Sequence, residues 1–155
     1  MDHQFDTQGR SVPQAFQEAV TAFARHAGLD PTHLIEGNAL EQNGIAFWLR
    51  HFGDDDTTGI TIQMDIGEPP ADPRSVVDMT TPLLQSHLCM PVGRFGYYGY
   101  LPHLNRIVHC TRIPLDEVED AATSIAAAIA TGAMFLAGAR TASAGFDVLT
   151  AKDPS

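Results

Sequence analysis

Positively charged residues are scarce in this sequence. Its 155 residues include 9 Lys and Arg against 19 Asp and Glu, which leaves a formal net charge of −10. A surface of this sign repels a phosphate backbone, so the composition argues against nucleic-acid binding. It would suit a basic or amphipathic partner, and it is equally compatible with a charge that only keeps the protein soluble.

Cysteines and long apolar runs are also few. The two cysteines, Cys89 and Cys110, lack CxxC spacing and are expected as buried free thiols, with a disulfide between them left open. No run is expected to reach the roughly 18 apolar residues of a membrane span, so no membrane insertion is predicted. The first six residues lack the basic-then-apolar layout of a signal peptide. We therefore expect a cytoplasmic protein.

Motifs that carry catalysis are missing as well. The sequence contains no P-loop, GxGxxG or GxSxG. Its seven histidines fall in different predicted elements, without HxH or HExxH spacing. Each cysteine has a histidine close in sequence, but neither pair shares a face of its element. The run at 54–56 is interpreted as a turn, because it lacks the spacing of a calcium loop. The sequence therefore predicts no enzyme, no cofactor and no metal site.

Hydrophobic periodicity predicts one α+β domain. Residues 1–10 are expected to be flexible, 11–138 to form the domain, and 139–155 to be a disordered tail. Short turns such as Asn43-Gly44 indicate a largely antiparallel, twisted sheet packed by helices. The predicted order is α-β-β-β-α-β-β-α, with helices at about 11–27, 75–89 and 116–138 and strands at about 33–40, 45–52, 59–66, 95–100 and 105–113.

Three positions define the expected helix boundaries. Ser11 is expected to cap the first helix and Gly28 to end it. Pro82 lies inside the second predicted helix, where it should either kink the helix or mark its start. Asp116 and Glu119 are expected to form a capping box at the start of the third helix.

The predicted sheet carries more apolar side chains than one covered face can bury. Trp48 and Phe52 share one strand face, while Phe47 and Leu49 lie on the other. Aromatic residues are expected on both faces of the strand at 95–100. A thin sheet with helices on one side cannot bury both faces, so we expect a dimer interface or a bound partner. The alternative is an ordinary core with scattered surface aromatics.

Several local marks occur in order along the chain. One strand ends in Ile66-Gly67-Glu68-Pro69-Pro70, the next helix carries Leu83-Leu84-x-x-x-Leu88, and the last strand passes into a helix through Arg112-Ile113-Pro114-Leu115-Asp116. With these marks, its apolar first helix and its acidity, the stretch 11–136 resembles the class I type III secretion chaperones of the Tir-chaperone (CesT/SycE-like) family of Gram-negative bacteria.

The resemblance implies a bacterial cytoplasmic homodimer without enzymatic activity. It would bind the N-terminal segment of a secreted effector in extended, non-globular form and keep it soluble and secretion-competent. Release would need an external machine such as the secretion ATPase. The implied effector-binding residues are Val12, Phe16, Val20, Phe47, Trp48, Leu49, Ile60 and Ile62. The implied dimer interface contains Leu83, Leu84, Leu88, Tyr97 and Tyr98.

Two other functions stay open on the residues alone. One is a dimeric protein-interaction adaptor unrelated to secretion. The other is a small-molecule or metal-dependent enzyme, which would need a closed pocket lined by histidine or carboxylate groups with perturbed pKa values.

Overall fold

The computed structural model describes residues 9–89 and 96–150 and confirms the predicted α+β class and element order. One short helix is added to that order. The helices are α1 (Gln14–Ala27), α2 (Pro31–Ile35), α3 (Pro73–Cys89) and α4 (Ala121–Thr150). The strands are β1 (Leu40–Gln42), β2 (Ile45–Arg50), β3 (Gly59–Gly67), β4 (Tyr97–Leu101) and β5 (Arg106–Pro114), and a short 3-10 turn covers Gly53–Asp55.

The five strands form one antiparallel sheet in the order β1-β2-β3-β5-β4, as the short turns predicted. The hairpin between β1 and β2 turns at Asn43-Gly44, where both residues have positive φ angles of 54° and 74°. Asparagine and glycine tolerate this conformation better than other residues, which explains the tight turn. The outer strands of the sheet are β1 and β4.

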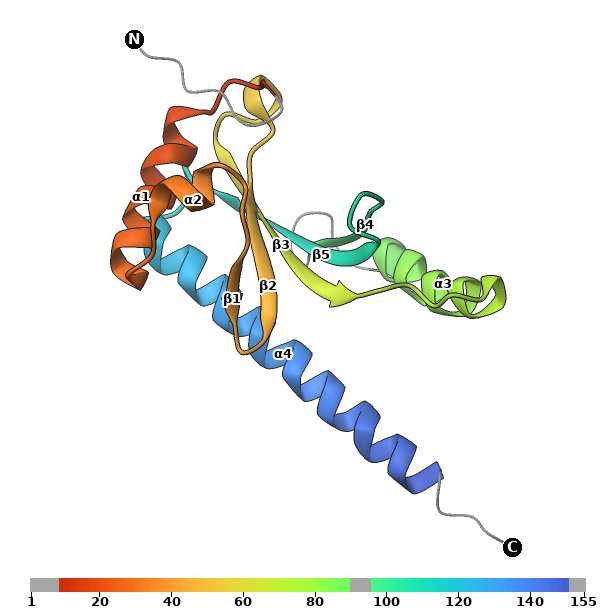
Figure 1. Ribbon diagram of the computed structural model, residues 1–155. Helices are drawn as coiled ribbons and strands as arrows, with labels where there is room; N and C mark the ends of the chain where they lie inside the picture. Colours follow the sequence, from red (N-terminus) through yellow and green to blue (C-terminus); the bar gives the residue numbers. More distant parts are fainter. Residues whose placement is uncertain (1–8, 90–95, 151–155) are drawn as a thin grey trace, which may run out of the picture.

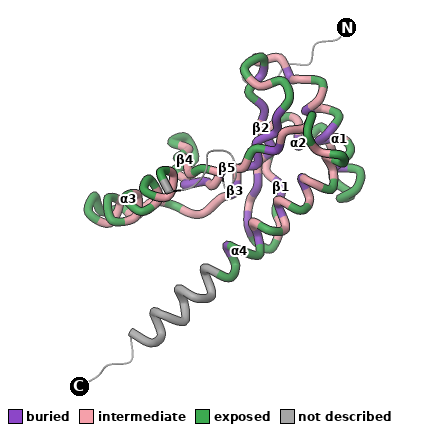
Figure 2. The backbone as a smooth tube through the Cα atoms, turned by 180° about the vertical axis from the view of Figure 1, so that it is seen from behind, coloured by how far each residue is buried: buried purple, intermediate pink, exposed green. Residues whose placement is uncertain are grey.

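The hydrophobic core lies between one face of the sheet and the pair α1 and α4 (Figure 1). Alternate residues of β2 and β3 point toward these helices, and Figure 2 shows the buried stretches concentrated in the same strands. The largest fully buried side chains are Phe16 and Val20 of α1, Leu34 of α2, Ile45, Phe47 and Leu49 of β2, Ile60 of β3, Val108 of β5, and Ile125 and Ile129 of α4.

Two expectations near the N-terminus are corrected. The helix α1 begins at Gln14 with Pro13 at its cap, so Ser11 is not the N-cap; Gly28 does end the helix, with φ 70°. The strand expected at 33–40 is not formed: residues 33–35 belong to the helix α2, and β1 begins only at Leu40. The cap of α2, Asp30, accepts a hydrogen bond from the Thr32 backbone N–H at 3.0 Å. A capping Asp followed by Pro is a helix-start signal, and it outweighed the weak strand pattern.

The last helix differs from the prediction at both ends. It starts at Ala121, where Asp120 accepts hydrogen bonds from the Thr123 backbone N–H at 3.2 Å and from its hydroxyl at 2.7 Å. Asp116 and Glu119 therefore precede the helix and do not form its capping box. The helix continues to Thr150 instead of ending near Gly138.

The first part of α4 also corrects the expectation about apolar runs. By length and composition alone, Ala121–Gly138 is apolar enough to cross a membrane. In the structure, one stripe of this segment packs into the core of the domain through Ile125, Ile129 and Ala133. The apolar composition thus has a structural use within the fold.

The helix α3 lies apart from the other helices (Figure 1). It begins after Asp72, which accepts hydrogen bonds from the backbone N–H groups of Arg74 and Ser75 at 3.1 and 3.2 Å. It passes through Pro82 as one continuous element, so Pro82 does not mark its start. Its main contact with the rest of the described chain is with the edge strand β4.

Candidate binding surface between α3, the sheet and α4

An apolar pocket of about 540 Å³ lies between α3, the core-facing side of the sheet and α4. Each wall comes from a different part of the chain. The floor is formed by Met64 and Ile66 of β3 with His109 and Thr111 of β5, one wall by Ser86 and His87 of α3 with Gly96 and Tyr98, and the other by Ala127, Ala128, Thr131, Gly132, Phe135 and Leu136 of α4.

The pocket exists because α1 and α4 cover only part of the sheet. Along β3, the inward residues Ile60 and Ile62 are buried in the core, whereas Ile66 is only partly buried. Gly132 lets α4 approach the sheet closely, because a Cβ atom there would come within 3.0 Å of the Met64 Sδ. Beyond this contact, the floor of the sheet is left open toward α3.

His87 connects the α3 wall to the strand β4. The Tyr98 backbone N–H donates a hydrogen bond to the His87 Nε2 at 2.8 Å, and the two rings stack with centroids 5.8 Å apart. Tyr98 also meets His109 edge-on, at a centroid distance of 5.0 Å. Three rings from three successive elements, α3, β4 and β5, therefore form a continuous array at the pocket.

Large apolar side chains are exposed on α3 and on α4. On α3, Val77, Leu84 and Leu88 are separated by seven and four residues, which places them along one helix face. Leu84 is 63% exposed, Leu88 is 90% exposed, and Phe135 at the pocket is 70% exposed. Exposed apolar side chains that gather on one face are a feature of interaction surfaces.

Two ion pairs on β5 connect the sheet to acidic residues. Arg106 donates to Asp65 of β3 at 2.9, 3.1 and 2.7 Å and lies 3.6 Å from Glu68. Arg112 donates to Asp56, after the 3-10 turn, at 2.7 and 2.9 Å. The hydrogen bond from Arg112 lowers the pKa of the Asp56 carboxyl below its ordinary value. The acidic run at 54–56 thus forms a turn, and the ion pair between Asp56 and Arg112 connects this turn to β5.

Cys110 lies on the other side of β5 from His109. Its partner in the sheet is Tyr97, whereas His109 is paired with Tyr98 and faces the pocket. Burial raises the pKa of the Cys110 thiol, which keeps it in the weakly nucleophilic protonated form.

The side chain of Cys89 lies outside the described residues, as does Phe95. Within the described ranges, no group of three or more His, Cys, Asp or Glu residues is arranged to hold a metal ion.

The structure separates the two sets of predicted binding residues. Leu84, Leu88 and Tyr97 of the predicted dimer interface are exposed, and Leu83 and Tyr98 are partly buried. Of the predicted effector-binding residues, Trp48 is partly buried. The other seven belong to the core of the single chain: Val12, Phe16, Val20, Phe47, Leu49, Ile60 and Ile62. Their contact with a partner would require this core to open.

Sequence reasoning did not find the pocket between α3 and α4. One usable signal was present in α4, where Met134 and Phe135 fall outside the buried stripe that ends at Leu136. A large aromatic residue off the core stripe of an amphipathic helix indicates a second surface to be covered. The residues of α3 that line the pocket could not be predicted from the sequence pattern, because the pocket depends on the distance between α3 and α4.

Comparison with known proteins identifies the fold. No protein-family model matches the chain, and no curated protein matches its sequence. A solved structure is similar: the Yersinia pestis type III secretion chaperone SycH, crystallised in complex with a stable fragment of YscM2. It is 12% identical, and the match covers 78% of this chain and 98% of that chain with a TM-score of 0.50. The chain has a type III secretion chaperone-like fold. Membership of the Tir-chaperone family is a finer assignment than this likeness supports.

Proposed function

We propose that this protein is a type III secretion chaperone that holds an extended segment of a secreted polypeptide. The observation that carries the proposal is the apolar pocket between α3, the sheet and α4, whose lining residue Phe135 is 70% exposed. The likeness of the fold to SycH supports it. The SycH structure also contains a fragment of another protein, which suits a polypeptide partner for this chain.

An apolar side chain of the partner would fill the pocket. Full burial of one large aliphatic or aromatic side chain contributes about 1.5–3 kcal/mol, so a single anchor gives a modest affinity and several are needed. Trp48 offers a further contact of this kind on β2. The net charge of −10 would favour segments with basic residues beside their apolar anchors. Binding in extended form would keep the segment unfolded until an external machine such as the secretion ATPase removes it.

The exposed face of α3 would pair with a second copy of the chain. Val77, Leu84 and Leu88 present one stripe, and Tyr97 is exposed on the neighbouring strand β4. Two such stripes related by a two-fold axis would cover each other, which is the usual arrangement in homodimers. Each copy would then bring its own pocket, so a dimer could hold two stretches of one partner chain.

Co-purification with a secreted protein tests the function. The chain would be co-expressed with the secreted protein encoded beside its gene, with and without that protein's N-terminal segment. We expect a soluble complex of two chaperone chains and one partner, formed only when the segment is present. The proposal would be contradicted if the secreted protein stays soluble without binding the chain and the chain itself is a monomer in solution. A dimeric chain that binds a protein without a secretion segment would favour the adaptor function instead.

A further inference from the structure

Ring side chains are concentrated at the pocket between α3, the sheet and α4. Among the described lining residues, rings are carried by His87, Tyr98, His109 and Phe135. The Tyr98 ring stacks on His87 and meets His109 edge-on, with centroid distances of 5.8 and 5.0 Å. Phe135 belongs to the α4 wall and is 70% exposed, so its ring is accessible to a ligand. A flat side chain that enters the pocket can therefore contact rings from both walls.

A sulfur atom lies at the floor of the same pocket. Met64 of β3 lines it, and a Cβ atom at Gly132 of α4 would come within 3.0 Å of the Met64 Sδ. Because Gly132 is also a lining residue, the sulfur lies where the floor meets the α4 wall. A thioether sulfur makes favourable contacts with the edge of an aromatic ring, and an aliphatic side chain has no ring edge to offer.

Two kinds of attraction rank anchor side chains differently. Burial alone favours the larger apolar area, so a saturated cyclohexyl group should bind at least as tightly as a phenyl group. Contacts between aromatic rings are stabilising beyond the area that they bury, and they favour the phenyl group. Rings on both walls and a sulfur on the floor add this second attraction, so the lining favours an aromatic anchor over an aliphatic one of similar size.

We propose that this pocket selects an aromatic side chain as the anchor of the bound polypeptide, through the rings of Tyr98 and Phe135 and the sulfur of Met64. That the ligand is a polypeptide rests on the proposed function. The preference for a ring is a property of the pocket, so it can be measured with a single capped amino acid. It narrows the partner to polypeptides with Phe, Tyr or Trp at the position that enters the pocket.

Two capped amino acids that differ only in ring saturation test the preference. The probes are the N-acetyl amides of phenylalanine and of cyclohexylalanine. Each is titrated into the whole isotope-labelled chain and followed by NMR at the Gly132 amide and the Met64 methyl group. We expect the dissociation constant of the phenylalanine probe to be about two- to tenfold lower. Equal or tighter binding of the cyclohexylalanine probe would overturn the proposal, and so would the absence of shifts at both reporters with either probe.

Two variants remove the ring and the sulfur separately. Phe135→Leu replaces an exposed ring by an aliphatic side chain, and Met64→Leu removes the sulfur at nearly constant volume. Each should reduce the preference for the phenylalanine probe, measured at the Gly132 amide. The matched controls are Phe52→Leu and Met134→Leu, at exposed positions outside the described lining, and both should keep the preference. An unchanged preference in both pocket variants would refute the assignment.

The preference and the proposed function can fail separately. If the phenylalanine probe binds more tightly but no secreted protein co-purifies with the chain, the chemistry of the pocket stands and the proposed function is contradicted. If a secreted protein co-purifies but the cyclohexylalanine probe binds more tightly, the proposed function stands and the aromatic anchor is wrong.

Discussion

Asp65 of β3 and Arg106 of β5 are joined by a forked ion pair, with Arg106 Nε 2.9 Å from Asp65 Oδ1 and Arg106 Nη2 2.7 Å from Asp65 Oδ2. The pair lies beside the irregular register between Asp65 and Gly67, where the two strands lose regular pairing. Two charge-assisted hydrogen bonds at this point stabilise the part of the sheet that forms the pocket floor.

Replacing Asp65 with Asn should therefore destabilise the fold. We expect the free energy of unfolding to fall by about 1–2 kcal/mol, because Arg106 loses its charged acceptor at a partly buried site. Urea denaturation followed by circular dichroism measures this. The matched control is Glu68→Gln, whose partner is the same Arg106 at 3.6 Å and whose effect should stay below about 0.5 kcal/mol. Equal effects of the two changes would show that the forked geometry adds nothing.

The ion pair between Asp56 and Arg112 predicts a defined sensitivity to acid. Its hydrogen bond lowers the pKa of Asp56 in the folded state below its ordinary value of 3.8, so the pair stabilises the protein above that pH. This stabilisation is lost as the pH falls through the lower, folded-state pKa. The variant Arg112→Gln should lose less stability than the unmodified protein when the pH falls from 5 to about 2.5. Urea midpoints at both pH values test this, and parallel losses in the two proteins would contradict it.

Leu84→Asp should abolish the proposed dimer. A carboxylate at the centre of an apolar two-fold interface is unpaired and costly to bury, whereas Leu84 is 63% exposed in the single chain, so the fold should survive. Analytical ultracentrifugation should show a folded monomer, with an unchanged circular dichroism spectrum. Gln85→Asp, the exposed neighbour on another face of α3, serves as the control and should stay dimeric. An intact dimer in Leu84→Asp would place the interface elsewhere.

Filling the pocket should weaken partner binding. Thr131 is exposed and lines the pocket from α4, so Thr131→Trp would occupy the space without entering the core. Loss of one buried anchor is expected to lower the affinity for the partner segment by about tenfold or more. Ala22→Trp, at an exposed position of α1, is the control. Titration calorimetry measures both, and unchanged affinity in Thr131→Trp would exclude the pocket as the anchor site.

The sheet was largely predictable because its strands alternate. Along β2, side chains that alternate in the sequence also alternate between buried and half-buried positions, and Asn43-Gly44 indicates the turn before β2 directly. The first four residues of β3 are all buried, although Ile60, Ile62 and Met64 alternate in the sequence. The helix starts were less predictable, because Asp116 and Asp120 both resemble caps, and it is Asp120 that accepts the capping hydrogen bond from the Thr123 backbone N–H. Local chemistry thus indicates where a helix can begin, but it leaves the exact first residue open by a few positions.

The binding residues were harder to predict for a related reason. Alternation shows that Phe47 and Ile62 face something apolar, but it does not distinguish the chain's own helices from a partner. In the structure, α1 and α4 cover both residues. The pocket depends on the spacing between α3 and α4, which are far apart in the sequence. Its contributors, such as His87 and Phe135, carry no local pattern that links them.

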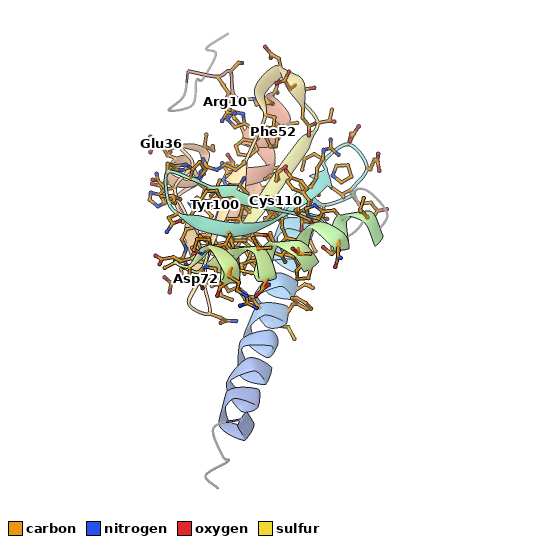
Figure 3. All side chains as sticks on the ribbon, turned by 90° about the vertical axis from the view of Figure 1, so that its right-hand side faces the viewer. Arg10, Glu36, Phe52, Asp72, Tyr100 and Cys110 are labelled. Atoms are coloured by element: carbon orange, nitrogen blue, oxygen red, sulfur yellow. The ribbon has the colours of Figure 1, made fainter. Side chains whose placement is uncertain are left out.

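The length of α4 has a practical consequence for labelling. The last core residue of α4 whose burial is described is Leu136, and the helix continues for 14 further residues to Thr150. At about 1.5 Å per residue this is a length of roughly 20 Å beyond Leu136. In Figure 3 it runs away from both α3 and the sheet. An affinity tag or fluorophore attached after this helix would sit clear of the pocket and of the α3 face, so immobilisation from that end leaves both surfaces accessible to measurement.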